Sequence, residues 1–154
     1  MIASLPREIE NPLTGEEVRF IRTTEETAGE LLVMEDRWPA GHRSVAHLHP
    51  TLEEHWQVIE GRATLTIAGD ERELGPGSSA LARPGEPHWG RCVEPVVMRV
   101  VMRPAGRWED FARQLFALAG EELDPVETER SVNELLSSFS REVQLVPMRG
   151  PTAR

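Results

Sequence analysis

The feature that most constrains the fold is a series of short, strand-like runs between residues 17 and 103, closed by glycine or proline. The clearest run is Arg62–Ala68, in which Ala63, Leu65 and Ile67 alternate with polar residues. Alternation of apolar and polar residues is the pattern of a strand with one buried face. Several short strands at regular spacing are typical of a sandwich or barrel. The residues therefore predict an all-β domain.

The two flanks of this region have a different character. Residues 1–16 are interrupted by proline and glycine and are expected to form a loose N-terminal arm. Residues 104–146 contain two runs with the apolar spacing of a helix face, Arg107–Ala119 and Pro125–Phe139. We expect this helical extension to pack on the barrel or on a partner subunit. Residues 147–154 are expected to form a tail.

The composition excludes several kinds of chemistry. All 17 basic residues are arginine, so the chain has no lysine for a Schiff base or a Walker-type phosphate loop. The single cysteine, Cys92, allows neither an intrachain disulfide nor a cysteine-rich zinc site. A net charge of −9 argues against nucleic acid or an anionic membrane as a partner. The sequence has no apolar run of spanning or secretory length, so we expect a cytoplasmic protein.

Four of the five histidines lie close together in the sequence. His47 and His49 are two residues apart, so on a strand both side chains point to the same face. A hairpin after this strand would bring Glu54 beside the pair, and His88 begins a later strand after a proline-rich turn. Imidazole suits zinc, copper, iron and nickel, and an added carboxylate keeps manganese and cobalt possible. His47, His49, Glu54 and His88 therefore predict a site for one divalent transition metal.

Neighbouring residues compete with this set. Glu53 is the rival of Glu54, but strand alternation points the two side chains to opposite faces, and the spacing favours Glu54. His55 falls on the outward face of the same strand, and His42 is expected to be exposed. If the chemistry needs a general base, Glu53 or Glu54, displaced from the metal, is the candidate.

The inside of the predicted barrel is expected to be apolar and to suit a small organic substrate with oxygen donors. Its expected lining consists of Met34, Leu65, Ile67, Leu81 and Met98. Trp56 shares the inward face with Glu54 and either lines the pocket or fills the core. Cys92 lies four residues after His88 and would share its face if the strand is regular. Leu65, Ile67, Trp56 and Cys92 are therefore the pocket candidates.

Two stretches match the motifs of a known family. The first is G-(x)5-H-x-H-(x)4-E-(x)6-G, which is met completely by Gly41, His47, His49, Glu54 and Gly61. This pattern is the first cupin motif. The second cupin motif, G-(x)5-P-x-G-(x)2-H-(x)3-N, is met at Gly77, Gly85 and His88. The sequence departs from it at Arg83 and Cys92, where the family usually has proline and asparagine.

The chain thus resembles a small single-domain cupin over residues 17–103. The resemblance implies a double-stranded β-helix, or jelly-roll barrel, with the helical extension outside it. It also implies that His47, His49, Glu54 and His88 hold one metal ion, with iron, manganese, nickel, copper, cobalt and zinc all open. A homodimer is the common state of the family.

The same resemblance implies a range of functions that includes dioxygenases, isomerases, decarboxylases, lyases and plain binding proteins. We expect a metal-dependent oxidoreductase of dioxygenase type, because three histidines and one glutamate are the ligand set that such cupins show. Its substrate would be a small aromatic, enolic or dicarbonyl compound. One alternative is a non-redox isomerase or lyase that uses the metal as a Lewis acid. Another is a non-catalytic protein that binds a small molecule.

Overall fold

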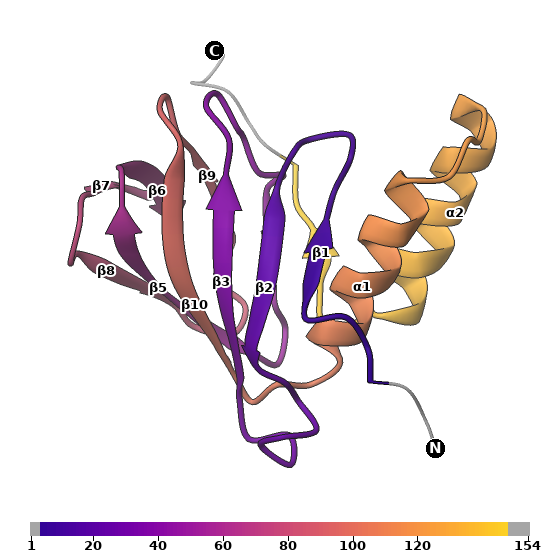
Figure 1. Cartoon of the computed structure of the whole chain (residues 1–154), viewed down its shortest axis with the longest axis horizontal. Coiled ribbons are helices and arrows are strands. Elements are labelled where there is room, and N and C mark those ends of the chain that lie inside the picture. The colour runs from indigo at the N-terminus through magenta and orange to yellow at the C-terminus, as the bar shows by residue number, and fades with distance from the viewer. Residues whose placement is uncertain (1–3, 148–154) are drawn as a thin grey trace.

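The computed structural model describes residues 4–147, and its strands form two antiparallel sheets (Figure 1). The larger sheet has the order β1-β2-β3-β10-β5-β8, and the smaller has the order β11-β4-β9-β6-β7. The strands are β1 (Glu8–Glu10), β2 (Glu17–Arg22), β3 (Leu32–Trp38), β4 (His47–Leu48), β5 (Glu53–Glu60), β6 (Ala63–Ile67), β7 (Asp70–Leu74), β8 (Ser79–Ala82), β9 (His88–Arg91), β10 (Val96–Arg103) and β11 (Gln144–Leu145). Neighbours in space that are distant in sequence are a mark of jelly-roll barrels, so the predicted fold class is confirmed.

The interior of the barrel is filled by alternate residues of its strands. In β10, which lies between β3 and β5, the buried side chains are those of Val96, Met98, Val100 and Met102. Leu81 does not belong to this interior, although the sequence suggested that it would. It is 37% exposed, because the alternation of β8 turns its two alanine neighbours inward.

One turn of the first sequence motif accepts no side chain. Gly61 has a φ of +83°, and a Cβ built on it would overlap the carbonyl oxygen of Pro95. The turn between β5 and β6 therefore packs directly on the chain just before β10. Glycine is the residue that fits both the positive φ and the close approach.

Two helices, α1 (Trp108–Ala119) and α2 (Pro125–Ser138), lie side by side next to β1 (Figure 1). Polar contacts fix α1 to the barrel of the same chain. The buried Glu109 carboxylate accepts hydrogen bonds from the Thr24 backbone N–H at 2.9 Å and from Arg113 at 3.0 Å. The Arg113 guanidinium also lies over the Phe20 ring, 4.3 Å from its centroid.

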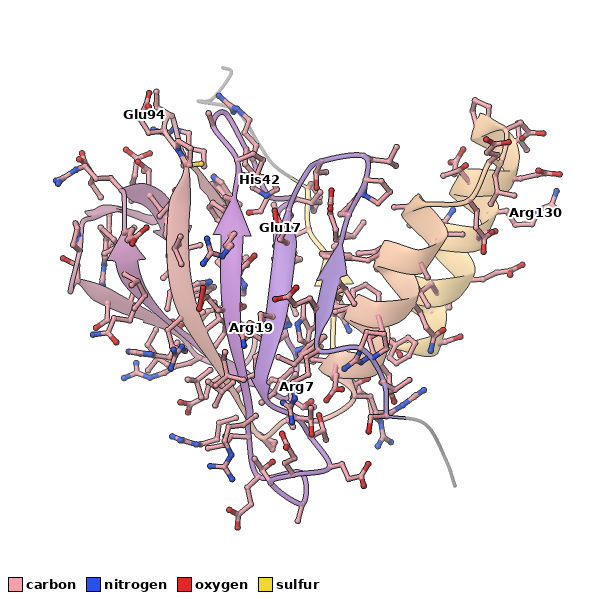
Figure 2. All side chains as sticks on the ribbon, viewed as in Figure 1. Arg7, Glu17, Arg19, His42, Glu94 and Arg130 are labelled. Atoms are coloured by element: carbon pink, nitrogen blue, oxygen red, sulfur yellow. The ribbon has the colours of Figure 1, made fainter. Side chains whose placement is uncertain are left out.

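The N-terminal segment is more ordered than expected. Glu8–Glu10 forms β1 and pairs with β2, because the chain returns through a turn at residues 12–14. Figure 2 shows Glu17 and Arg19 of β2 and Arg130 of α2 among the exposed charged side chains. Of the predicted tail, residues 148–154 lie outside the described part of the chain. Within residues 4–147, no helix combines the length and the apolar character needed to cross a bilayer.

Candidate metal centre

The four predicted ligands meet at one place inside the barrel. His47 of β4 is paired directly with His88 of β9, His49 follows β4, and Glu54 is the second residue of β5. One ligand atom from each side chain lies within 4.8 Å of the other three. Glu54, His49 and His88 are buried, and His47 is half-buried. Two strands of the smaller sheet and one of the larger sheet therefore build the site together.

Backbone carbonyl groups determine which ring nitrogen each histidine presents. The Nδ1 atom of His47 is 2.7 Å from the Val45 oxygen, that of His49 is 2.8 Å from the Glu142 oxygen, and that of His88 is 3.0 Å from the Glu86 oxygen. A carbonyl oxygen can only accept, so each Nδ1 carries the hydrogen and donates it. Each neutral ring consequently has its lone pair on Nε2.

The Nε2 atoms gather around one carboxylate. The Nε2 atoms of His49 and His88 lie 2.9 Å and 3.2 Å from Oε1 of Glu54. Among residues 4–147, the buried His88 Nε2 has no hydrogen-bond partner of acceptable geometry. Lone pairs and a carboxylate that converge without a donor between them suit a shared cation. The donor set of three imidazoles and one carboxylate fits a divalent transition metal.

The electrostatics of the site agree with this assignment. Burial, and then the neighbouring His88 and His49, lower the pKa of His47 to about 4. Burial by itself would raise the pKa of Glu54, but the His49 and His88 rings beside its carboxylate outweigh burial and hold this pKa below its usual range. Burial would lower the pKa of His88, but Glu54 reverses the shift and raises it. Both shifts show that the site favours a positive charge between Glu54 and His88.

Three of the four ligands, His47, Glu54 and His88, line a cavity of about 310 Å³ whose other walls are largely apolar. Trp56, Leu65 and Ile67, three of the four pocket candidates, line it. The Trp56 ring lies 5.0 Å from that of His88. Cys92 is not among the residues that line this cavity; it follows the end of β9, and its thiol donates to the Pro39 carbonyl at 3.2 Å.

Other residues near the motif take places that the alternation of β5 explains. Glu53 and His55 lie on the opposite face from Glu54, which leaves Glu54 as the carboxylate at the site. His42 is buried rather than exposed, because its ring packs on Trp38 with a 4.8 Å centroid separation. Figure 2 shows His42 beyond the end of β3.

The helical extension contributes to the site in a way that the sequence did not indicate. The Trp108 ring of α1 lies edge-on to His49, with 4.8 Å between centroids. The Glu142 carbonyl, 93 residues away from His49, holds the Nδ1–H of that ligand. The apolar stripe of α1 was a signal for packing, but no sequence signal marks a backbone acceptor.

Comparisons with known proteins agree with this geometry. The cupin domain family (Cupin_2) matches residues 34–102. A quercetin 2,3-dioxygenase of Bacillus subtilis (strain 168) is 29% identical over 104 residues, which are 67% of this chain and 31% of that enzyme. This chain thus spans about a third of the length of that curated relative.

Two solved structures show the same fold. An RmlC-like cupin from Shewanella frigidimarina NCIMB 400 superposes with a TM-score of 0.58 and 22% identity, covering 68% of this chain and 88% of that one. KdgF from Halomonas sp. superposes with a TM-score of 0.53 and 20% identity, covering 58% and 79%. The matched segment contains all four candidate ligands and the strands that carry them. Residues 34–102 of this chain therefore form a domain of the cupin-2 type.

Proposed function

We propose that this protein is a mononuclear metal-dependent oxidoreductase of dioxygenase type, acting on a small organic substrate inside the barrel. The observation that carries the proposal is the arrangement of the ligands. Three histidines, each held by a carbonyl at Nδ1, and the Glu54 carboxylate converge within 4.8 Å beside an apolar cavity. Four protein ligands would leave coordination positions free on a six-coordinate metal.

The match to quercetin 2,3-dioxygenase supports an oxidative reaction. It spans 104 residues at 29% identity. It covers only 31% of that enzyme, so its activity is transferred here as a proposal. An enolic compound that bears adjacent oxygen atoms is the substrate class that this relationship favours.

Each side chain has a definable task in such a reaction. A bound redox-active metal would supply activation of dioxygen and polarisation of the substrate oxygen atoms. His47, His49 and His88 would hold it through Nε2, and Glu54 through a carboxylate oxygen. The low pKa of Glu54 keeps this group ionised, so that its negative charge is available to the cation. The Trp56 and Trp108 rings next to the ligands would exclude water from the reacting atoms.

The position of Glu54 favours one second candidate, a non-redox isomerase or lyase. In that reaction the metal would polarise a carbonyl group, and Glu54 would serve as the general base. Glu53, the other base that the sequence allowed, lies on the outer face of β5 and is a poor candidate. A protein that binds a small molecule without turnover would use the same cavity.

Oxygen uptake separates these functions. The protein, purified with its own metal, is mixed with 3-hydroxyflavone in an oxygen-electrode cell. We expect consumption of one dioxygen per flavonol, loss of this activity in His88→Ala, and its retention in His55→Ala, which alters a residue on the outer face. Turnover that is independent of oxygen would favour the isomerase or lyase, and binding with no turnover would favour the binding protein. A cytoplasmic location and a homodimer stay predictions within this proposal.

A further inference from the structure

The cavity has a second polar region away from the metal ligands. Asp36 and Trp38 lie on the inward face of β3 and line the same cavity as Glu54. Leu32 of β3 and Glu54 of β5 both pair with Met102 of β10, so they lie two strands apart at the same level. Asp36 follows Leu32 by four residues along β3. The Cα atoms of Asp36 and Glu54 are therefore separated by about 13 Å along the strands and about 10 Å across them. A ligand that reaches both regions must have polar groups at two separate ends.

Two polar atoms in this second region lack hydrogen-bond partners. Trp38 is 5% exposed, and its indole Nε1–H has no acceptor within the described part of the chain. Asp36 is partly buried, and its buried Oδ1 atom is likewise unpartnered among residues 4–147. Buried polar groups in folded proteins nearly always have partners, so two unpartnered groups that line one cavity indicate a missing ligand. One of the two is a donor, and the other is an acceptor.

The surrounding residues hold this pair in place. Gly90 of β9 has no side chain, and a Cβ there would lie 2.8 Å from Cη2 of Trp38, so the glycine makes room for the indole ring. The Trp38 ring also packs on His42. Burial, followed by the nearby Glu16 carboxylate and then by Glu54, raises the pKa of Asp36 well above its usual value, and the Trp38 indole beside it opposes this shift only in part. These surroundings therefore favour the neutral form of Asp36.

A hydroxyl group is the ligand function that fits both atoms. Its hydrogen can be donated to Asp36 Oδ1 while its oxygen accepts from the Trp38 indole N–H. An ammonium group would satisfy Asp36 but would leave the Trp38 N–H unpaired. A carboxylate would be repelled by the acidic pair. The apolar residues between the two regions match a ligand body of aromatic or aliphatic carbon.

We propose that Asp36 and Trp38 form a hydroxyl-recognition site at the end of the cavity remote from the metal. The substrate would then carry oxygen donors for the metal at one end and a separate hydroxyl group at the other. This inference rests on the proposed function for the metal end of the substrate. The two residues determine specificity through binding, and they hold no metal and touch no reacting atom.

The test compares two ligands that differ by one hydroxyl group, 3-hydroxyflavone and 3,4′-dihydroxyflavone. Affinities are measured by calorimetry without oxygen, on protein that retains its own metal. We expect the dihydroxy compound to bind at least about tenfold more tightly. 3-Hydroxyflavone lacks the second hydroxyl group and therefore leaves two buried polar groups unpaired. Trp38→Phe and Asp36→Leu should each reduce this ratio to about twofold or less, with unchanged metal content. Arg37→Leu, on the exposed outer face of β3, is the control.

A direct measurement accompanies the variants. The indole N–H resonance of Trp38, identified by its loss in Trp38→Phe, should shift when the dihydroxy compound binds and should not shift with 3-hydroxyflavone. Equal affinities in the unaltered protein, no binding of either compound, or full discrimination in both variants would each overturn the proposal. Oxygen uptake is measured separately in air. Discrimination without uptake would refute the dioxygenase function alone, whereas uptake with equal KM values would refute the hydroxyl site alone.

Discussion

Replacing Phe139 by alanine should weaken metal binding, although Phe139 does not touch the ligands. Phe139 is 1% exposed and packs with Phe111, Leu135 and Val143 in an apolar cluster within the helical extension. Removing a buried phenylalanine side chain costs about 3–5 kcal/mol. The Phe111 ring, whose centroid lies 5.5 Å from that of Phe139 at an interplanar angle of 62°, loses its partner. The variant should therefore loosen the packing between α1 and the segment that follows Phe139.

This loss reaches the metal centre through the segment that follows Phe139. The Glu142 carbonyl accepts the Nδ1–H of His49, and the Arg141 carbonyl accepts the hydroxyl of Thr51 at 2.8 Å. When this segment shifts, the acceptor that fixes the His49 ring moves with it. Loss of such an outer partner lowers metal affinity by about 10- to 100-fold.

The assay is competition for zinc between the protein and a chelator of known affinity, together with urea unfolding of the metal-free protein. The control variant is Val126→Ala, because Val126 lies on α2 and is 67% exposed. This control should change neither the zinc affinity nor the free energy of unfolding. A Phe139→Ala protein that is destabilised as expected but binds zinc as tightly as the unaltered chain would refute the role of the extension.

Three further predictions concern the ligands and the barrel. Glu54→Gln should reduce the metal content of the purified protein by at least about tenfold, and Glu53→Gln should leave it unchanged, as elemental analysis would show. Because Glu54 raises the pKa of His88, protons compete with the metal for this ring. Zinc affinity should fall by up to about tenfold for each pH unit below that pKa, and zinc titrations at several pH values would measure this fall. In the metal-free protein the same shift stabilises the fold below the ordinary pKa of histidine, and this stability is lost as the pH rises through the raised value. Gly61→Ala should lower the free energy of unfolding in urea by about 1–3 kcal/mol or more, because a positive φ is unfavourable for alanine and its Cβ would overlap the Pro95 carbonyl. An unchanged free energy of unfolding would contradict this steric argument.

The ligand set could be predicted from the sequence because it depends on local spacing. The separation of two between His47 and His49, and the hairpin that returns to Glu54, follow from strand alternation and turn residues. The alternation of β5 likewise separates Glu54 from Glu53. The position of His88 required the family motif, because nothing local predicts that β9 pairs with β4.

Other features could not be predicted, because they depend on contacts between distant segments. The Glu142 carbonyl reaches His49 only after the two helices have returned the chain to the barrel. Cys92 was expected to face the cavity on the assumption of a regular strand, but β9 ends at Arg91 and the thiol turns toward Pro39. Asp36 lies directly after Glu35, so no clean alternation marked it as an inward residue.

The most direct test of the metal centre is a crystal structure of protein purified without added metal, with anomalous scattering recorded at the absorption edge of the element found by elemental analysis. We expect one peak about 2.0–2.2 Å from Nε2 of His47, His49 and His88 and from a Glu54 oxygen. Each Nδ1 should keep its carbonyl partner. Absence of a peak, or a metal bound through Nδ1, would contradict the assignment of these four ligands.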